Sequence, residues 1–348
     1  MSFWNNLPKP FFVMAPMADV TDVAFRALVA ARGAPDVFWT EFISADGLYH
    51  TRPVRDKTSE MSDLLSAGVS NGTSEIQRSE GHEALLRNLA FGENQRPIVA
   101  QIFSSKPEMI AYAVRLVAEL GFDGVDINMG CPDRTIEKQG AGAALVKNPA
   151  LAVELIRAAR EASELPVSVK TRIGYNKESL DEWLTALLLA GPAAITLHLR
   201  TRKEMSLVPA DWELMKKAME IRNHINPDVL LIGNGDAQDI ADAKIKIAES
   251  GCDGVMLGRA MFGNPWVFEG ISGHPMSTHG LDEKLEALIE LAHGFEKISP
   301  PKHFAILKKH IKAFVTGFDG AAELRALLMQ AENAHELASA IHLPENRL

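Results

Sequence analysis

Short apolar runs rich in Val, Ile and Leu recur along most of the chain, and segments with helical spacing of apolar positions lie between them. This alternation predicts a parallel sheet with helices packed on its outside. Eight strand–helix units in about 260 residues match the usual size of a (β/α)8 TIM barrel. The runs expected to form strands are residues 11–15, 37–41, 98–102, 124–127, 167–170, 194–197, 230–232 and 254–257.

A doubly wound open sheet is the alternative architecture for such a pattern. Dinucleotide-binding sheets of that kind commonly carry Gly-x-Gly-x-x-Gly after their first strand. Nothing like this motif follows residues 11–15, so the closed barrel is favoured.

The pattern changes after Gly280, where three amphipathic segments follow one another without a further strand. Residues 282–298, 302–316 and 321–341 are predicted to be helices, separated by Pro300-Pro301 and by a glycine-bounded turn at 317–320. We therefore expect a barrel in residues 1–275 and a small all-helical domain in residues 276–348.

Residues 51–80 form a polar excursion after the second predicted strand, with one short helix expected at 60–67. Long loops in compact domains are often functional, although a solvated insertion fits this composition equally well. The role of the segment stays open.

Composition excludes several classes of protein. The 348 residues are 47% apolar and 23% charged, which is ordinary for a globular chain, and no apolar run approaches the length of a membrane span. The first residues lack the basic and apolar regions of a secretory signal. The two cysteines, Cys131 and Cys252, are expected to be reduced thiols in a cytoplasmic protein. The oligomeric state is beyond the sequence, and we expect a monomer.

Charge gives a mixed indication about nucleic acid. The net charge of −9 argues mildly against such a partner, but RNA responds to local potential. Between Lys297 and Lys312 the chain holds five lysines, two histidines and no acid. This run is either a solvated helix face or a surface that follows phosphates.

Polar residues follow the predicted strands at the point where each one ends. In a barrel these ends share one mouth, where the chemistry of such folds takes place. The residues at the strand ends are Pro16, Met17 and Ala18, then Glu41, Gln101, Asn128 with Cys131, Lys170 with Arg172, His198 with Arg200, Asn234, Gly235 and Asp236, and Gly258 with Arg259.

The last two strand ends carry glycines, which let backbone N–H groups approach an anion closely. Gly-Asn-Gly-Asp, residues 233–236, is by itself more often a plain turn. Beside Gly258-Arg259 it becomes a credible phosphate clamp, because loops after strands 7 and 8 are the usual phosphate seat of this fold.

Cys131 lies in a Gly-Cys-Pro turn just past a strand. The proline restricts the backbone, so the thiol is held rigidly where it can act on a ligand. The alternatives are purely structural roles: an ordinary buried thiol for Cys131, an ion pair with Asp126 for Lys170, and a core histidine for His198.

The segment 126–146 resembles the signature of the tRNA-dihydrouridine synthases, flavin enzymes that reduce uridine in RNA. Further stretches match that family in the same order and together span about residues 11 to 270. They are 15–19 (APMAD), 101–103 (QIF), 170–172 (KTR), 198–202 (HLRTR), 233–236 (GNGD) and 258–259 (GR).

The resemblance implies FMN as cofactor, NADPH as transient reductant, tRNA as partner and no metal. It implies that Cys131 donates a proton to C5 of the uracil while C6 receives a hydride. Asn128 and Arg172 match positions that hold the extruded base, Arg200 and Arg202 are expected at phosphates or bases, and the helical domain is expected to help grip RNA. The matching FMN-binding positions are Pro16, Met17, Ala18, Gln101, Lys170, His198, Asn234, Gly235, Asp236, Gly258 and Arg259.

One departure from the family pattern concerns the loop after His-x-Arg-Thr-Arg. The family commonly has Tyr and Gly there, where this chain has Ser206 and Val208. Contacts to RNA are therefore open, together with the target uridine and the subgroup. Two other readings stay in view: a flavin barrel acting on a free dihydropyrimidine or dihydroorotate type of molecule, and a non-catalytic RNA-binding protein.

Overall fold

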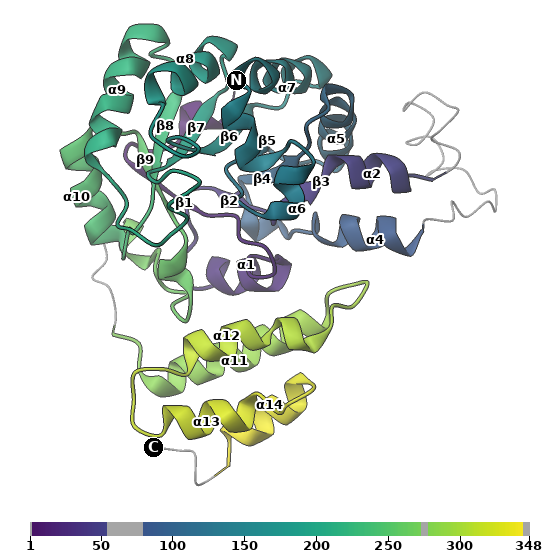
Figure 1. The fold of residues 1–348 in the computed structure, drawn as a ribbon. Coiled ribbons are helices and arrows are strands. Elements are labelled where there is room, and N and C mark those ends of the chain that lie inside the picture. The colour runs from purple at the N-terminus through teal and green to yellow at the C-terminus, as the bar shows by residue number, and fades with distance from the viewer. Residues whose placement is uncertain (1, 54–78, 273–277, 344–348) are drawn as a thin grey trace.

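A closed ring of parallel strands forms the centre of the computed structural model, which describes residues 2–53, 79–272 and 278–343 (Figure 1). Neighbouring strands pair in the order β1-β9-β8-β7-β6-β5-β4-β2, and a bridge between Val13 and Val37 joins β1 to the second strand. The (β/α)8 barrel is confirmed and the open sheet was wrong. The strands are β1 (Phe11–Met14), β2 (Phe38–Trp39), β3 (Ile43–Ser44), β4 (Ile98–Phe103), β5 (Gly124–Met129), β6 (Val167–Arg172), β7 (Ala194–His198), β8 (Leu230–Asn234) and β9 (Gly254–Leu257).

The second barrel strand is interrupted, contrary to the single run predicted at 37–41. Both β2 and β3 pair with β4, with Trp39 opposite Val99 and Ile43 opposite Ile102. The interrupted strand thus carries one residue more than its partner between these pairs, which is a bulge. Bulges redirect side chains, and this one contains Glu41, which is buried at the barrel mouth.

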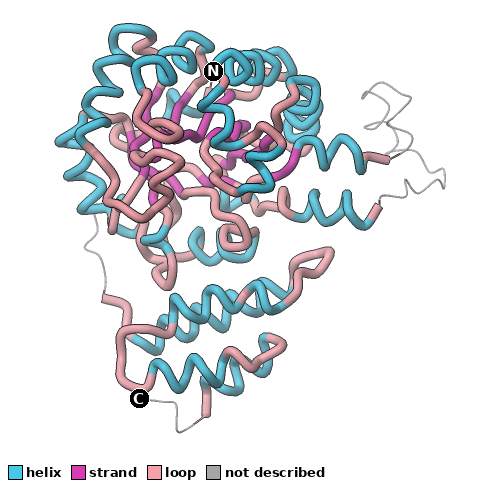
Figure 2. The backbone as a smooth tube through the Cα atoms, in the orientation of Figure 1, coloured by secondary structure: helices cyan, strands magenta, loops and turns pink. Residues whose placement is uncertain are grey.

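Helices surround the strands as an outer layer (Figure 2). Proline occupies the first turn of α5 and α7, where its missing N–H costs nothing. Asp22 caps α1 by accepting from the N–H groups of Ala24 and Phe25. The helices around the barrel are α1 (Val23–Ala30), α2 (Ala45–Thr51), α4 (Glu80–Arg87), α5 (Pro107–Glu119), α6 (Arg134–Lys138), α7 (Pro149–Ala162), α8 (Leu180–Ala190), α9 (Glu213–Ile225) and α10 (Ile240–Ser250).

Short 3-10 turns link these elements. They are η1 (Phe3–Asn6), η3 (Glu93–Gln95), η4 (Gly142–Lys147), η5 (Arg259–Met261), η6 (Glu269–Ser272) and η7 (Phe304–Ile306). Trp4 of η1 packs against Phe11 and Trp39, and with other apolar side chains it fills the amino-terminal end of the barrel. The opposite end is left to polar residues. Cys252 lies buried, and both cysteines are free thiols, as expected.

A helical bundle follows the barrel and lies beside α1 (Figure 1). Its helices are α11 (Leu281–Glu296), α12 (Lys308–Phe314), α13 (Ala321–Leu328) and α14 (Ala334–Ile341). The predicted helix at 302–316 is thus a 3-10 turn followed by a shorter helix. The helix predicted at 321–341 is two helices, because Asn333 caps a new one by accepting from the N–H of Glu336.

Two predictions lie outside the described residues: the short helix at 60–67 and the domain boundary between residues 275 and 276. Among residues 2–53, 79–272 and 278–343, no helix combines the length and apolar character needed to cross a lipid bilayer.

Candidate active site

The carboxyl ends of β4 to β8 bring the predicted polar residues together. The parallel register places Gln101 opposite Asp126, and Asn128 opposite Lys170. It likewise places Arg172 opposite His198, and His198 opposite Asn234. The residues therefore form an arc around one mouth, as their positions at the strand ends predicted.

A chain of hydrogen bonds runs from the barrel interior to the cysteine turn. The Gln101 side chain donates to Asp126 (2.7 Å) and accepts from the Asn128 amide (3.0 Å). Asn128 Oδ1 accepts in turn from the N–H groups of Gly130 (3.1 Å) and Cys131 (2.9 Å). Asn128 therefore holds the turn that carries the thiol, a role that its expected place at the substrate did not include.

Asp126 anchors this chain from a fully buried position. Burial raises the pKa of Asp126 to about 6, against hydrogen bonds from Ser168 and Gln101 and the charge of Lys170. Lys170 itself donates to Asn234 (3.1 Å), so the alternative of an Asp126 ion pair is not what the structure shows.

Cys131 lies half-buried against a small apolar cluster. Burial raises the pKa of the Cys131 thiol, although the charges of Arg172 and Lys170 act in the other direction. The thiol is therefore protonated at neutral pH, which suits a proton donor better than a nucleophile. The apolar neighbours are Phe42, Phe103, Ile136 and Ala141.

Gly142 explains why glycine follows the cysteine turn. Its φ is +61°, and a Cβ there would lie 2.7 Å from the Cys131 carbonyl oxygen. Without a side chain, η4 folds back so that the Ala143 N–H donates to that oxygen (2.9 Å). The glycine thus allows a second contact that fixes the Cys131 backbone.

Two arginines expected at the RNA join the cysteine turn to the loop between β7 and α9. Arg172 donates to the carbonyls of Gly130 (2.8 Å), Thr201 (3.1 Å) and Met205 (2.9 Å). Arg202 pairs with Glu137 of α6, directly after the turn. Burial lowers the pKa of Arg172 to about 10, so it stays charged at neutral pH.

His198 is a neutral imidazole with a defined proton position. Burial, followed by the charges of Lys170, Arg172, Arg200 and Arg259, holds its pKa well below the ordinary value. Arg200 donates to His198 Nε2 (3.1 Å), and because a guanidinium cannot accept, the ring proton lies on Nδ1. His198 can therefore donate one hydrogen bond from Nδ1.

Arg200, which was expected to contact a phosphate or a base of the RNA, is almost completely buried. It donates to the Val208 carbonyl (2.6 Å) and pairs with Asp236. Although burial acts in the opposite direction, hydrogen bonds from Arg200 and the Ala210 N–H hold the pKa of Asp236 below its usual value. Arg200 thus supports the loop after β8.

The predicted phosphate clamp has the backbone shape that close approach requires. Gly235 has φ +129°, and a Cβ there would lie 2.7 Å from Ala210. Asp236 follows with φ +56° and also pairs with Arg259, whose side chain is 64% exposed. Arg259 is therefore an accessible cation beside a glycine turn.

The loop after β1 completes the mouth. Its Met17 sulfur lies close to Gly258, since a Cβ on that glycine would be 3.8 Å from the sulfur atom. The Met17 carbonyl accepts from the N–H groups of Val20 (3.1 Å) and Thr21 (3.0 Å). Residues 16–18, expected to bind FMN, therefore border the predicted phosphate clamp.

Lys170 is the cation at the centre of this arc. Burial and the neighbouring charge of Arg172 lower the pKa of Lys170 to about 8, so it is mostly charged at neutral pH. Within the described part of the chain, no three His, Cys, Asp or Glu side chains gather in a way that could hold a metal ion.

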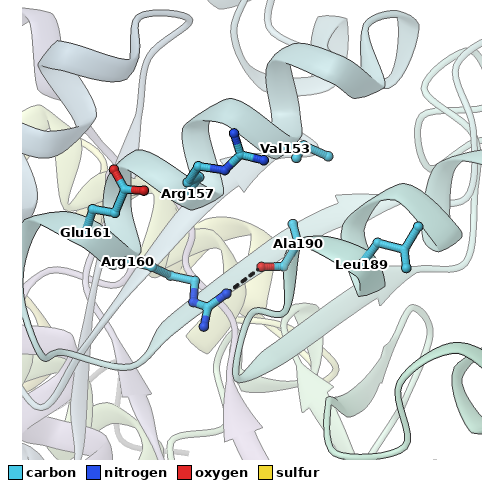
Figure 3. A pocket seen from close by; sticks show the side chains of 6 residues that line it. All are labelled: Val153, Arg157, Arg160, Glu161, Leu189 and Ala190. Atoms are coloured by element: carbon cyan, nitrogen blue, oxygen red, sulfur yellow. Dashed lines mark hydrogen bonds between the residues drawn. The ribbon is translucent and has the colours of Figure 1, made fainter.

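A separate surface pocket lies on the outer helices. Figure 3 shows its lining between α7 and α8, where Arg160 donates to the Ala190 carbonyl (2.8 Å). None of the predicted site residues lines it, and it carries no part of the candidate site. The lining residues are Val153, Arg157, Arg160, Glu161, Leu189 and Ala190.

Sequence reasoning missed Glu137 and Lys302 as site-supporting residues. Glu137 follows the cysteine by six positions in an ordinary helix, and its partner Arg202 lies 65 residues away. Lys302 lies in a basic run, which did not indicate that its side chain is buried against Glu41, 261 residues away. Neither pairing leaves a local pattern in the sequence.

The fold and the mouth together define the class: an enzyme built on a (β/α)8 barrel. A solved structure, 2-naphthoyl-CoA reductase in complex with 2-naphthoyl-CoA, shares the fold with a TM-score of 0.52 and 10% identity. That similarity covers 75% of this chain and 50% of the reductase chain. At so low an identity, it supports the fold alone.

Sequence comparison gives the family. The model described as dihydrouridine synthase matches residues 73–346. A Bacillus subtilis protein named "probable tRNA-dihydrouridine synthase 2" is 39% identical, covering 97% of this chain and 94% of that protein. A Staphylococcus aureus protein named "probable tRNA-dihydrouridine synthase" is 38% identical, covering 96% and 93%. This chain belongs to the dihydrouridine synthase family, as the motifs predicted.

Proposed function

We propose that this enzyme reduces the C5–C6 double bond of a uridine in tRNA to dihydrouridine. The observation that carries the proposal is the Cys131 thiol, held on a rigid turn at the mouth with a raised pKa. A proton donor there is what saturation of a uracil ring requires, and the family relationship supplies the substrate class.

The groups around the mouth fit FMN. Lys170 and Arg259 are cations, His198 offers one N–H, and the turn at Gly235 and Asp236 lies beside Arg259. Cations and N–H donors suit a phosphate and the electron-rich edge of a flavin. The residues proposed to hold it are Pro16, Met17, Ala18, Gln101, Lys170, His198, Asn234, Gly235, Asp236, Gly258 and Arg259.

Bound FMN would supply the hydride for C6 of the uracil, with NADPH as the proposed source of electrons. The protein's own step is the transfer of the Cys131 thiol proton to C5 from the other face. The sulfur then carries a negative charge, which the nearby charges of Lys170 and Arg172 stabilise until solvent returns a proton. Hydride and proton together balance the reduction.

A uridine in folded RNA must leave its stack to reach this mouth. We propose that Asn128, Arg172, Arg200 and Arg202 contribute chiefly by fixing the walls of the pocket, because their polar atoms are engaged in bonds to neighbouring loops. We propose a cytoplasmic location because the partner is tRNA. The enzyme is proposed to be a monomer.

The helical domain, proposed to comprise residues 276–348, would help to grip the RNA. Lys297, Lys309 and Lys312 are exposed on it and can follow phosphates. Lys302 and His310 of the same basic run are buried, so the run is not one continuous binding surface.

The direct test incubates the purified protein with NADPH and an unmodified tRNA transcript, and measures dihydrouridine by mass spectrometry. We expect a gain of two hydrogens at a single uridine. Turnover of free uracil or dihydroorotate, with none on tRNA, would instead favour the small-molecule barrel reductase.

Cys131→Ala separates the two halves of the reaction. The variant should still be reduced by NADPH, because the alanine leaves the proposed flavin residues in place. Its uridine reduction should fall by about 10²- to 10⁴-fold, since the positioned acid is lost. Equal loss of both steps, or no loss of uridine reduction, would contradict the assigned role.

A further inference from the structure

The helical domain inserts one lysine into the barrel next to the mouth. Lys302 Nζ lies 2.8 Å from Glu41 Oε2 and 3.7 Å from Asp22 Oδ2. The side chains of Lys302, Glu41 and Asp22 are 3%, 4% and 5% exposed, so this ion pair is withdrawn from water although 261 residues separate Lys302 from Glu41.

Both carboxylates use their second oxygen to accept from backbone N–H groups, Glu41 from the segment between β1 and α1 and Asp22 from the start of α1. Glu41 Oε1 accepts from the N–H of Asp19, and Asp22 Oδ1 accepts from the first turn of α1. Asp19 has φ +55°, an unfavourable backbone angle for a residue with a side chain, so Glu41 stabilises a strained position. Asp19 directly follows residues 16–18, which are proposed to bind the flavin.

Further contacts between the domains converge on the same place. Arg87 of α4 donates to the carbonyls of Pro300 and Pro301 (3.0 Å each), just before Lys302. Lys309 of α12 pairs with the Asp19 carboxylate (2.9 Å). The helical domain thus holds the loop after β1 through Lys302 and Lys309, while its backbone turn at Pro300 and Pro301 is bound to α4.

Charge balance makes Lys302 necessary in the cluster. Arg26 is a second buried cation near Glu41 and Asp22. Its guanidinium is already engaged by Gln95 and by the carbonyls of Thr21 and Ala90. Without Lys302, the two buried carboxylates would keep backbone N–H donors but have no cation bound to them directly, an arrangement that proteins avoid.

We propose that Lys302 is a positioning residue that locks the helical domain onto the loop at residues 17–22 and thereby fixes residues 16–18, which are proposed to bind the flavin. The carboxylates of Glu41 and Asp22 bind the ammonium group of Lys302, which belongs to the same chain. The inference rests on the proposed function, because that proposal assigns residues 16–18 to the flavin. Its consequence is that placement of the RNA-gripping domain and cofactor affinity depend on one buried ion pair.

The test compares full-length Lys302→Met with Lys312→Met, a matched loss of an exposed lysine in the same domain. Hydrogen exchange followed by mass spectrometry should show at least tenfold faster exchange at residues 17–22 in Lys302→Met only. The β5–β6 core should be unchanged, whereas general destabilisation would speed its exchange as well. The FMN dissociation constant of the variant should rise at least tenfold.

Should Lys302→Met fail to fold, the double variant Glu41→Gln with Lys302→Met restores charge balance and replaces it. Measured against wild type, it should show faster exchange at residues 17–22 with the β5–β6 core unchanged, because the ion pair is absent. Exchange at the wild-type rate at residues 17–22 of the Lys302 variants, or an equal effect of Lys312→Met, would overturn the proposal. Because exchange requires neither tRNA nor turnover, a protein inactive on tRNA could still retain this lock.

Discussion

Cys131 and Lys170 have pKa values that burial displaces in opposite directions. The pKa of the Cys131 thiol is raised above its usual value and the pKa of the Lys170 ammonium group is lowered to about 8, so both groups are protonated at pH 7. As the pH rises, Lys170 is the first of the two to lose its proton. The pH dependence therefore distinguishes them.

Uridine reduction should decline as the pH rises through about 8, because Lys170 then becomes neutral while Cys131 is still protonated. Above that point the single-turnover rate should fall about tenfold per pH unit if the neutral lysine is inactive. Lys170→Arg keeps the charge and should move the decline to higher pH. A wild-type profile that stays flat from pH 7 to 9.5 would contradict this assignment.

At this scale the sequence indicated which residue types meet at the mouth. Strand ends alone placed Gln101, Lys170 and His198 there, because parallel strands in a barrel all end at the same rim. The partners of Arg172 and Arg200 were not predictable. A guanidinium can bond a phosphate or a carbonyl equally well, and only the folded loops decide which of these is near.

Among the elements, the cysteine turn and the loop between β7 and α9 are connected by side-chain bonds. Arg172 bonds both of them through carbonyls, and Arg202 connects the loop to Glu137 of α6. Movement of one should therefore displace the other, including the thiol.

Glu137→Gln tests this connection. Loss of this partly buried ion pair should lower kcat for uridine reduction by about tenfold, equivalent to about 1.4 kcal/mol, as expected for a charged hydrogen bond. Reduction of the flavin by NADPH should be unaffected. Glu154→Gln, an exposed site on α7, is the control. Equal kinetics of the two variants would show that the connection does not matter.

The elements themselves were largely readable from the sequence. The eight predicted runs all became strands because apolar repeats of that length have few alternatives in a barrel. Several strands continue further than expected, as β6 does through Arg172, since backbone pairing does not stop at the first polar side chain. The bulge at Glu41 and the break before Asn333 depend on pairing and capping, which composition does not reveal.

In the whole molecule, His310 marks the contact between barrel and helical domain. It is buried between Phe25 of α1 and Phe262, and burial together with the charge of Lys309 lowers the pKa of its imidazole to about 4. The unfolded chain has the ordinary value near 6.5 and so binds more protons between these limits.

Acid should therefore weaken the protein through this residue. Its stabilising contribution is complete above pH 6.5 and is lost as the pH falls toward 4, by about 2–3 kcal/mol between pH 7 and pH 4.5. His310→Leu should remove that part of the pH dependence in urea unfolding. If wild type and variant lose stability in parallel over this range, the imidazole is not responsible.

The central claim is that reducing equivalents from a bound flavin and a proton from Cys131 together saturate one uridine of a tRNA. Anaerobic mixing of the reduced holoenzyme with unmodified tRNA tests it directly, with flavin oxidation and dihydrouridine formation followed together. The account predicts that both proceed at one rate in the wild type and that both become slow in Cys131→Ala. A flavin that stays reduced while the tRNA mass is unchanged in the wild type would contradict it.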